Sequence, residues 1–196
     1  MSVTIGNSVT SIGEWAFYDC TGITSVIWNA EKCRFTKQDG IFRKCPNLNE
    51  IIIGNNVKIL PDFIFGECHR LTSVTIGNSV TSIGYGVFYN CSGLTSITIP
   101  DSVTRIDYGV FAGCSGLTSV TMSKNVTWID QSLFENCNSL TSIIMPDKLE
   151  VIYFDAFKGC TKLMHISLPS GLKAIFSDAF CGCTSLHEVN FKGTIE

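Results

Sequence analysis

Residues 71–93 read LTSVTIGNSVTSIGYGVFYNCSG, and copies of this 23-residue unit follow one another along the chain. Six copies have 23 residues and one has 25, and each carries a phenylalanine followed three residues later by a cysteine. With the first, partial copy the phenylalanines are Phe17, Phe42, Phe65, Phe88, Phe111, Phe134, Phe157 and Phe180, and the cysteines are Cys20, Cys45, Cys68, Cys91, Cys114, Cys137, Cys160 and Cys183. Self-similarity at this period is typical of solenoids, in which each unit forms one coil and stacks on the next.

Each unit contains the alternation of a strand with one buried face. Counted from its leucine, the unit at 71–93 has Val74 and Ile76 at offsets 3 and 5, with a threonine between them. A second apolar pair at offsets 9 and 12 predicts a short extended segment that returns across the coil. The spacing of the apolar residues at offsets 16, 17 and 20 favours a helical or 3₁₀ turn after it.

We expect one domain over residues 1–196, because no linker interrupts the repeats. Its predicted parts are a partial repeat at 1–22, an irregular repeat at 23–47, regular repeats at 48–185 and a partial repeat at 186–196. A lone coil cannot bury enough apolar surface to offset its ordering entropy, so stability depends on stacking. Both ends stop within a unit, and we therefore expect the uncapped ends to fray or to self-associate.

The repeated columns resemble those of the BspA-like leucine-rich repeat family of bacterial and protozoan surface proteins. LTSVTI matches the strand segment of leucine-rich repeats, and the remainder of the unit matches I/V-P-x-S-V-T-x-I-x-x-x-x-F-x-x-C. The resemblance implies an α/β repeat: a right-handed, curved solenoid of about eight 23-residue coils. It implies a parallel β-sheet on the concave side, and short return strands and helical turns on the convex side.

The resemblance also implies a non-catalytic module for protein binding or adhesion, on the cell surface or secreted. Its partner would be a protein or peptide, such as a host or neighbouring-cell surface protein. No leader peptide precedes the first repeat, so a cytoplasmic location stays open. A structural spacer or stalk that binds nothing itself is the alternative function.

The 25-residue repeat departs from the pattern between Trp28 and Phe42. Neither register places the usual valine and isoleucine in the return segment, and Cys33 and Phe35 are the residues available to fill those columns. We expect a bulge on the convex side there.

Composition narrows the classes of partner. Charged residues make up 16% of the chain and the formal net charge is -3, which gives no basic surface for nucleic acid or for an anionic membrane. No apolar run is long enough for a membrane-spanning helix, so membrane insertion is not expected. No nucleophile elbow, phosphate-binding loop or dinucleotide motif occurs in a fitting context, so no enzyme activity and no cofactor are predicted.

The cysteines favour a structural role. Stacked coils would place the eight column cysteines about 5 Å apart, but parallel side chains do not point toward one another as a disulfide requires. A linear row also cannot supply the four convergent ligands that zinc prefers. We therefore predict a buried column of thiols, and if any thiol is reactive it should be Cys33 or Cys181, which lie outside the column.

The outward-facing strand residues provide the candidate binding surface. The middle copies carry only threonine and serine there, which suits a plain strand face or a polar recognition surface. The flanking copies carry apolar and charged residues, which favour a protein-binding patch: Ile27, Ile52, Ile144, Met164, His165, His187 and Glu188. The threonine array also resembles ice-binding solenoids, although curvature and the apolar interruptions would spoil a planar lattice.

Two further clusters permit more than one interpretation. His165, His187 and Glu188 outline part of a metal site, but the histidines lie at different offsets, and we interpret them as surface residues, with no metal bound. The aromatic residues at offsets 13 to 15 could form a platform for sugar or peptide, or could lie partly buried under the next coil: Trp15, Tyr85, Tyr108, Tyr153, Phe154 and Phe176.

Overall fold

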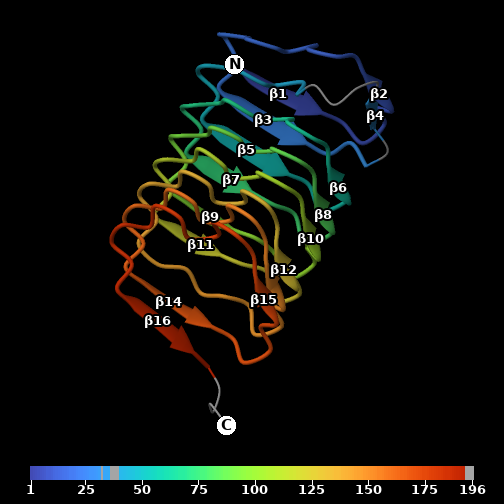
Figure 1. Ribbon diagram of the computed structural model, residues 1–196. Coiled ribbons are helices and arrows are strands. Elements are labelled where there is room, and N and C mark those ends of the chain that lie inside the picture. Colours follow the sequence, from blue (N-terminus) through green and yellow to red (C-terminus); the bar gives the residue numbers. More distant parts are fainter. Residues whose placement is uncertain (32, 36–39, 193–196) are drawn as a thin grey trace.

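The computed structural model describes residues 1–31, 33–35 and 40–192 and is a β-solenoid. Long strands lie one below another on one side of the stack and short return strands along another (Figure 1). The long strands are β1 (Ser2–Ile5), β3 (Ser25–Trp28), β5 (Glu50–Ile53), β7 (Ser73–Thr75), β9 (Ser96–Thr98), β11 (Ser119–Thr121), β14 (His165–Leu168) and β16 (Glu188–Phe191). The return strands are β2 (Ser11–Ile12), β4 (Arg34–Phe35), β6 (Ile59–Leu60), β8 (Ser82–Ile83), β10 (Arg105–Ile106), β12 (Trp128–Ile129), β13 (Val151–Ile152) and β15 (Ala174–Ile175).

Neighbouring coils pair in parallel and in register. Val3 lies opposite Val26, and Ile51 opposite Val74, so equal offsets of successive units are Cα partners. Along β9 the side chains alternate between exposed serine or threonine and the buried Ile97. The expected parallel strands and 23-residue coils are therefore confirmed, and the period-2 pattern identified their buried face.

The expected helical turn is wrong, because the described residues contain no helix. Offsets 15 and 19 have left-handed backbone conformations, as at Gly86 (φ 58°) and Asn90 (φ 55°), and two such residues four apart interrupt a right-handed helix. The amides bond between coils instead: Phe63 N donates to Tyr85 O (2.7 Å) and Glu67 N donates to Tyr89 O (2.6 Å). The turn thus adds a third line of inter-coil hydrogen bonds, and the fold is β rather than α/β.

The irregular repeat keeps the return-strand register. β4 pairs with β2 so that Phe35 lies opposite Ile12, the column in which the sequence suggested that it would lie. Cys33 is half-buried and packs against the core. Within the segment between Trp28 and Phe42, in which we expected a bulge, residues 32 and 36–39 lie outside the described residues.

The phenylalanine column forms a continuous stack through the interior. Successive ring centroids from Phe17 to Phe180 lie 5.0–6.2 Å apart with interplanar angles of 2–20°. Rings from Phe42 to Phe157 are fully buried, whereas Phe17 and Phe180 are half-buried because each has a neighbouring ring on one side. Coils therefore share one core, and each inner ring depends on two neighbours.

The turns permit a matched test of packing at two glycines. Gly86 and Gly109 occupy the same offset with φ of 58° and 63°, so alanine at either should cost about 1–2 kcal/mol of backbone strain. A Cβ on Gly86 would lie 2.5 Å from the Phe63 ring, whereas on Gly109 its nearest neighbour is Tyr85 at 3.6 Å. Gly86→Ala should lower the free energy of unfolding by about 1–3 kcal/mol more than Gly109→Ala, because only the former overpacks. Urea denaturation measures both, and equal losses would contradict this account.

Candidate functional site

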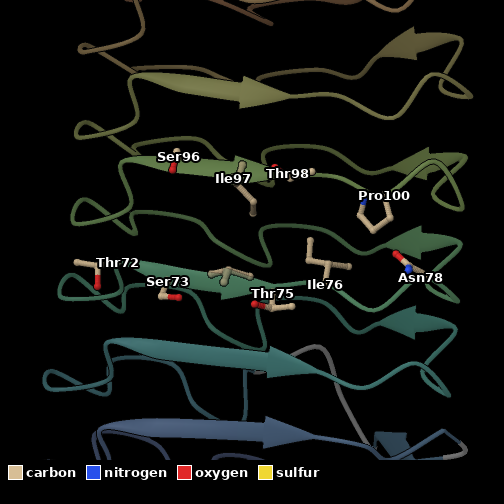
Figure 2. A pocket seen from close by; sticks show the side chains of 10 residues that line it. Thr72, Ser73, Thr75, Ile76, Asn78, Ser96, Ile97, Thr98 and Pro100 are labelled. Carbon is tan, nitrogen blue, oxygen red and sulfur yellow. The ribbon is translucent and has the colours of Figure 1, made fainter.

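The middle of the long-strand face consists of hydroxyl side chains around a shallow hollow. Thr72, Ser73 and Thr75 on and beside β7 lie next to Ser96 and Thr98 on β9 (Figure 2). The hollow has a volume of about 450 Å³ and is widely open. The offset-1 threonines also brace the stack, since Thr72 Oγ1 donates to the carbonyl oxygen of Asn49 (3.2 Å). Part of this hydroxyl array is thus structural.

Two of the predicted residues lie together toward the N-terminal end of this face. Ile27 on β3 and Ile52 on β5 are Cα partners at offset 4, and the rungs on either side carry Thr4 and Thr75. Ile27 is half-buried, whereas 37% of Ile52 is exposed. They form a small apolar interruption in a polar column.

Ile144 is the most exposed of the predicted apolar residues, at 81%. The coil at this point has no long strand; Ile144 alone bridges to Thr121 and Ser167. Beside it lies a hollow of about 270 Å³, whose apolar walls are Val120, Met122, Ile144, Met145 and Pro146 and whose polar rim is Thr121, Lys124, Asp147 and Lys192. Lys192 Nζ lies 3.3 Å from Asp147 Oδ1 at that rim. An apolar hollow with charged edges is the arrangement that a protein anchor residue fills.

The four remaining predicted residues share two adjacent rungs. His165 on β14 lies opposite Glu188 on β16, and His187 N donates to Met164 O at 3.1 Å. The two imidazoles occupy different columns, and Nδ1 of His187 contacts Ser185 O at 2.9 Å. Across the described ranges, no three His, Cys, Asp or Glu side chains converge as metal ligands. The structure thus separates Ile27 and Ile52 from the patch around Ile144, His165 and His187 by the hydroxyl rungs.

The column cysteines make a contact that the sequence reasoning missed. From Cys45 to Cys183, each column thiol donates to the carbonyl oxygen of the phenylalanine in the preceding coil, as in Cys114 Sγ to Phe88 O (3.1 Å) and Cys137 Sγ to Phe111 O (3.2 Å). All ten cysteines lie within the described residues and none forms a disulfide. The six from Cys45 to Cys160 are buried, Cys181 is exposed and the other three are half-buried.

Burial makes the inner thiols poor acids. It raises the pKa of Cys45 to about 11 and that of Cys114 to about 12, and it raises the pKa of Cys68, Cys91, Cys137 and Cys160 as well. Thiolates are the reactive and metal-binding form, so these groups are suited to packing and hydrogen bonding.

The aromatic residues at offsets 13 to 15 line one edge of the solenoid, here called the aromatic edge, and some of them stack on one another while others are exposed. Tyr85 and Tyr108 stack with centroids 4.5 Å apart, and Phe63 meets Tyr85 edge-on at 4.3 Å. Toward the C-terminus Tyr153 and Phe154 both contact Phe176, and at the N-terminus the exposed Trp15 contacts Tyr18. Phe63 was not among the aromatic residues selected from the sequence. It could have been found there, because it occupies offset 15, where the next two units have Gly86 and Gly109.

The whole chain matches the model of the BspA type leucine rich repeat region, over residues 1–117, 36–164 and 82–196. The chain belongs to the BspA-type leucine-rich repeat family. Repeat solenoids of this family are commonly protein-interaction modules and are generally non-catalytic. No match was found among curated proteins. Within the described ranges, this BspA-type chain has no helix that is long and apolar enough to cross a bilayer.

Several solved bacterial structures resemble this BspA-type chain. A T. pallidum leucine-rich repeat protein is 20% identical with a TM-score of 0.69, over 95% of this chain and 82% of that one. A leucine-rich repeat protein from Eubacterium ventriosum is 21% identical with a TM-score of 0.65, over 100% and 66%. One from Bacteroides ovatus is 31% identical with a TM-score of 0.53, over 96% and 60%. The chain thus spans less than two thirds of the length of the last.

Proposed function

We propose that this chain is a non-catalytic protein-binding module of the adhesion type that holds its partner on the long-strand face. The observation that carries the proposal is Ile144, an isoleucine left 81% exposed beside an apolar hollow. Its neighbours in the same column are Thr121 and Ser167, so the apolar surface is local rather than a property of the whole face. A cell-surface or secreted location, and a partner on a host or neighbouring cell, are part of this proposal.

The free energy gained by burying Ile144 is large enough for a small binding site centred on this residue. Full burial of an isoleucine side chain contributes about 1.5–3 kcal/mol, and a few such residues dominate most protein interfaces. Lys124 and Lys192 lie at the rim of the hollow, where they pair with Asp101 (3.4 Å) and Asp147 (3.3 Å), and these pairs can offer polar contacts to a partner at the edge of the interface. His165 and Glu188, which lie two and three rungs nearer the C-terminus than Thr121, extend the surface with polar contacts.

A structural spacer is the second candidate function. The threonines at offset 1 favour it, because their hydroxyls donate to the preceding rung, as in Thr118 Oγ1 to Thr95 O (2.9 Å). Residues used in this way stiffen the stack and offer less to a ligand. Self-association through the terminal coils would suit such a stalk, and Phe191 at the last described rung is 61% exposed.

A capture experiment with a matched control distinguishes the two functions. The chain is immobilised and exposed to extracellular-matrix and serum proteins, and the amount of each bound protein is measured. The variant Ile144→Thr with His165→Ala and His187→Ala should reduce capture of a specific partner by about tenfold or more, since anchor residues are lost. The control is Ile59→Thr, because Ile59 is 62% exposed but lies on return strand β6.

The proposed site would be contradicted if the triple variant captured as much of the partner as the unmodified chain does. It would also be contradicted if Ile59→Thr reduced capture as much as the triple variant does. If no protein is enriched by the unmodified chain, the spacer function is supported instead.

A further inference from the structure

A second hollow lies at the aromatic edge, outside the long-strand face. It has a volume of about 340 Å³ and an aromatic wall formed by Phe63, Tyr85, Tyr89 and Tyr108. Its floor includes Gly109 and Ala112, and Ser132 and Glu135 close one end while Arg43 closes the other. The hollow is therefore enclosed by aromatic, small and charged residues together, and not by a row of aromatic rings alone.

The hollow exists because small residues interrupt two columns. At offset 18 Tyr89, Ala112 and Glu135 follow one another on successive coils, since Asn90 N donates to Ala112 O and Gly113 N donates to Glu135 O. Tyr89 and Glu135 are therefore two rungs apart, about 10 Å at ordinary strand spacing. Ala112 lies on the intervening rung and is 7% exposed, so it forms the base of the hollow and leaves room above it for a partner side chain between the phenol ring and the carboxylate.

The charges around this hollow favour a cation. Arg43 is partly neutralised by Glu67, to which its Nε donates at 2.9 Å and which also pairs with Lys44 at 3.7 Å. Glu135 forms no ion pair among the described residues, and Lys158, one coil further in its column, pairs with Asp155 at 3.1 Å. On the other side of the tyrosine pair a neighbouring hollow carries Asp62, Asp107 and Asp130 against a single arginine, Arg105. Within the described part of the chain, Glu135 is thus a carboxylate without an ion pair at its end of the hollow, and on the other side of the tyrosine pair three aspartates outnumber one arginine.

The same edge already binds the protein's own cations to aromatic rings. The guanidinium carbon of Arg43 lies 5.2 Å from the Phe63 ring centroid, and Lys44 Nζ lies 5.8 Å from that of Tyr18. Aromatic faces attract cations through the ring quadrupole, most strongly where water is partly excluded. The faces of Tyr89 and Tyr108 that border the hollow have the same capacity.

We propose that this hollow binds a lysine or arginine side chain from a basic segment of a partner protein. The aliphatic stem would lie over Ala112 and Gly109, and the charged tip would lie between Glu135 and the tyrosine rings. The site is independent of the long-strand face and of the partner proposed for it.

Tyrosine-ring NMR of the isotopically labelled full chain tests the proposal. The probe is the peptide acetyl-Ser-Lys-Ser-Lys-Ser-amide, and its neutral counterpart has norleucine in place of lysine. We expect the lysine peptide to shift the ring signals of Tyr85, Tyr89 and Tyr108, and the norleucine peptide to shift them at least about fivefold less at equal concentration.

Two variants locate the contact. Glu135→Gln should weaken binding of the lysine peptide by about fivefold or more through loss of a charge-assisted contact. Ala112→Tyr should abolish binding by filling the hollow, and its fold should be retained because Tyr89 occupies the same column. Glu150→Gln is the control, since Glu150 pairs with Lys173 elsewhere and its loss should leave binding unchanged.

Equal binding of the norleucine peptide, no effect of Glu135→Gln, or no shift of the tyrosine signals would each overturn the proposal. So would cellohexaose shifting those signals where the lysine peptide does not, since the hollow would then bind sugar. Glu135→Gln removes charge without changing side-chain volume, so this comparison remains decisive even if Ala112→Tyr fails to fold.

Discussion

Raising the pH from 8 to about 10 is expected to unfold this protein. The six buried thiols from Cys45 to Cys160 stay protonated in the fold, with the pKa of Cys45 raised to about 11 and that of Cys114 to about 12. In an unfolded chain a cysteine ionises near a pKa of about 8.5. Above that pH the unfolded chain releases protons that the native protein keeps, so stability falls as pH rises.

The size of the effect follows from the number of thiols. Each thiol lowers the free energy of unfolding by about 1.4 kcal/mol per pH unit between its unfolded and folded pKa values. Six thiols together therefore lower the free energy of unfolding by about 8 kcal/mol per pH unit, whereas the total stability of a typical protein is about 5–15 kcal/mol. The stabilisation is complete below about pH 8 and is lost progressively toward pH 11, the pKa to which Cys45 is raised.

Circular dichroism with urea at a series of pH values, in the presence of a reductant, measures this loss. Cys114→Ala should reduce the slope between pH 9 and 10 by about one sixth, because one titrating thiol is removed. A stability that stays constant to pH 10.5 would contradict the buried, protonated column. Most tyrosine and lysine side chains ionise at about pH 10 or above, so the interval from 9 to 10 reports mainly on the thiols.

Phe111→Ala should destabilise the protein by about 3–5 kcal/mol, among the largest effects of a single core substitution. Phe111 is fully buried, and its ring stacks between Phe88 (5.8 Å) and Phe134 (5.5 Å). Alanine would leave a cavity between two coils in the middle of the stack. Since each coil is stabilised by its neighbours, the defect weakens the coupling between the two halves of the solenoid.

Phe17→Ala is the matched comparison. Phe17 is half-buried and stacks on Phe42 alone, at 5.0 Å, so its replacement should cost about half as much. Guanidinium denaturation gives both free energies, and a change in m-value for Phe111→Ala would reveal independent unfolding of the two halves. Equal costs at the two positions would show that burial between neighbours does not govern stability.

Much of the architecture is determined by the repeats themselves. A stretch such as LTSVTI must bury Val or Ile at offsets 3 and 5, and identical units reach that burial only by stacking in register. The columns of Val74 and Ile76, the return strands and the aromatic stack all follow from this requirement. The periodicity of residues 87–91, by contrast, fits a helical turn equally well, because apolar spacing alone does not report backbone φ.

Tertiary structure decided the path of the turn and the composition of its sites. The left-handed residues at Gly86 and Asn90 direct the turn amides toward the next coil, and that choice depends on hydrogen-bond partners 22 or more residues away. The thiol contact of Cys114 with Phe88 O, the exposure of Ile144 and the hollow over Ala112 likewise arise only between coils. The sequence specifies which residues recur at each offset. The thiol contact, the exposure of Ile144 and the hollow over Ala112 depend in addition on which residues the adjacent coils bring next to them.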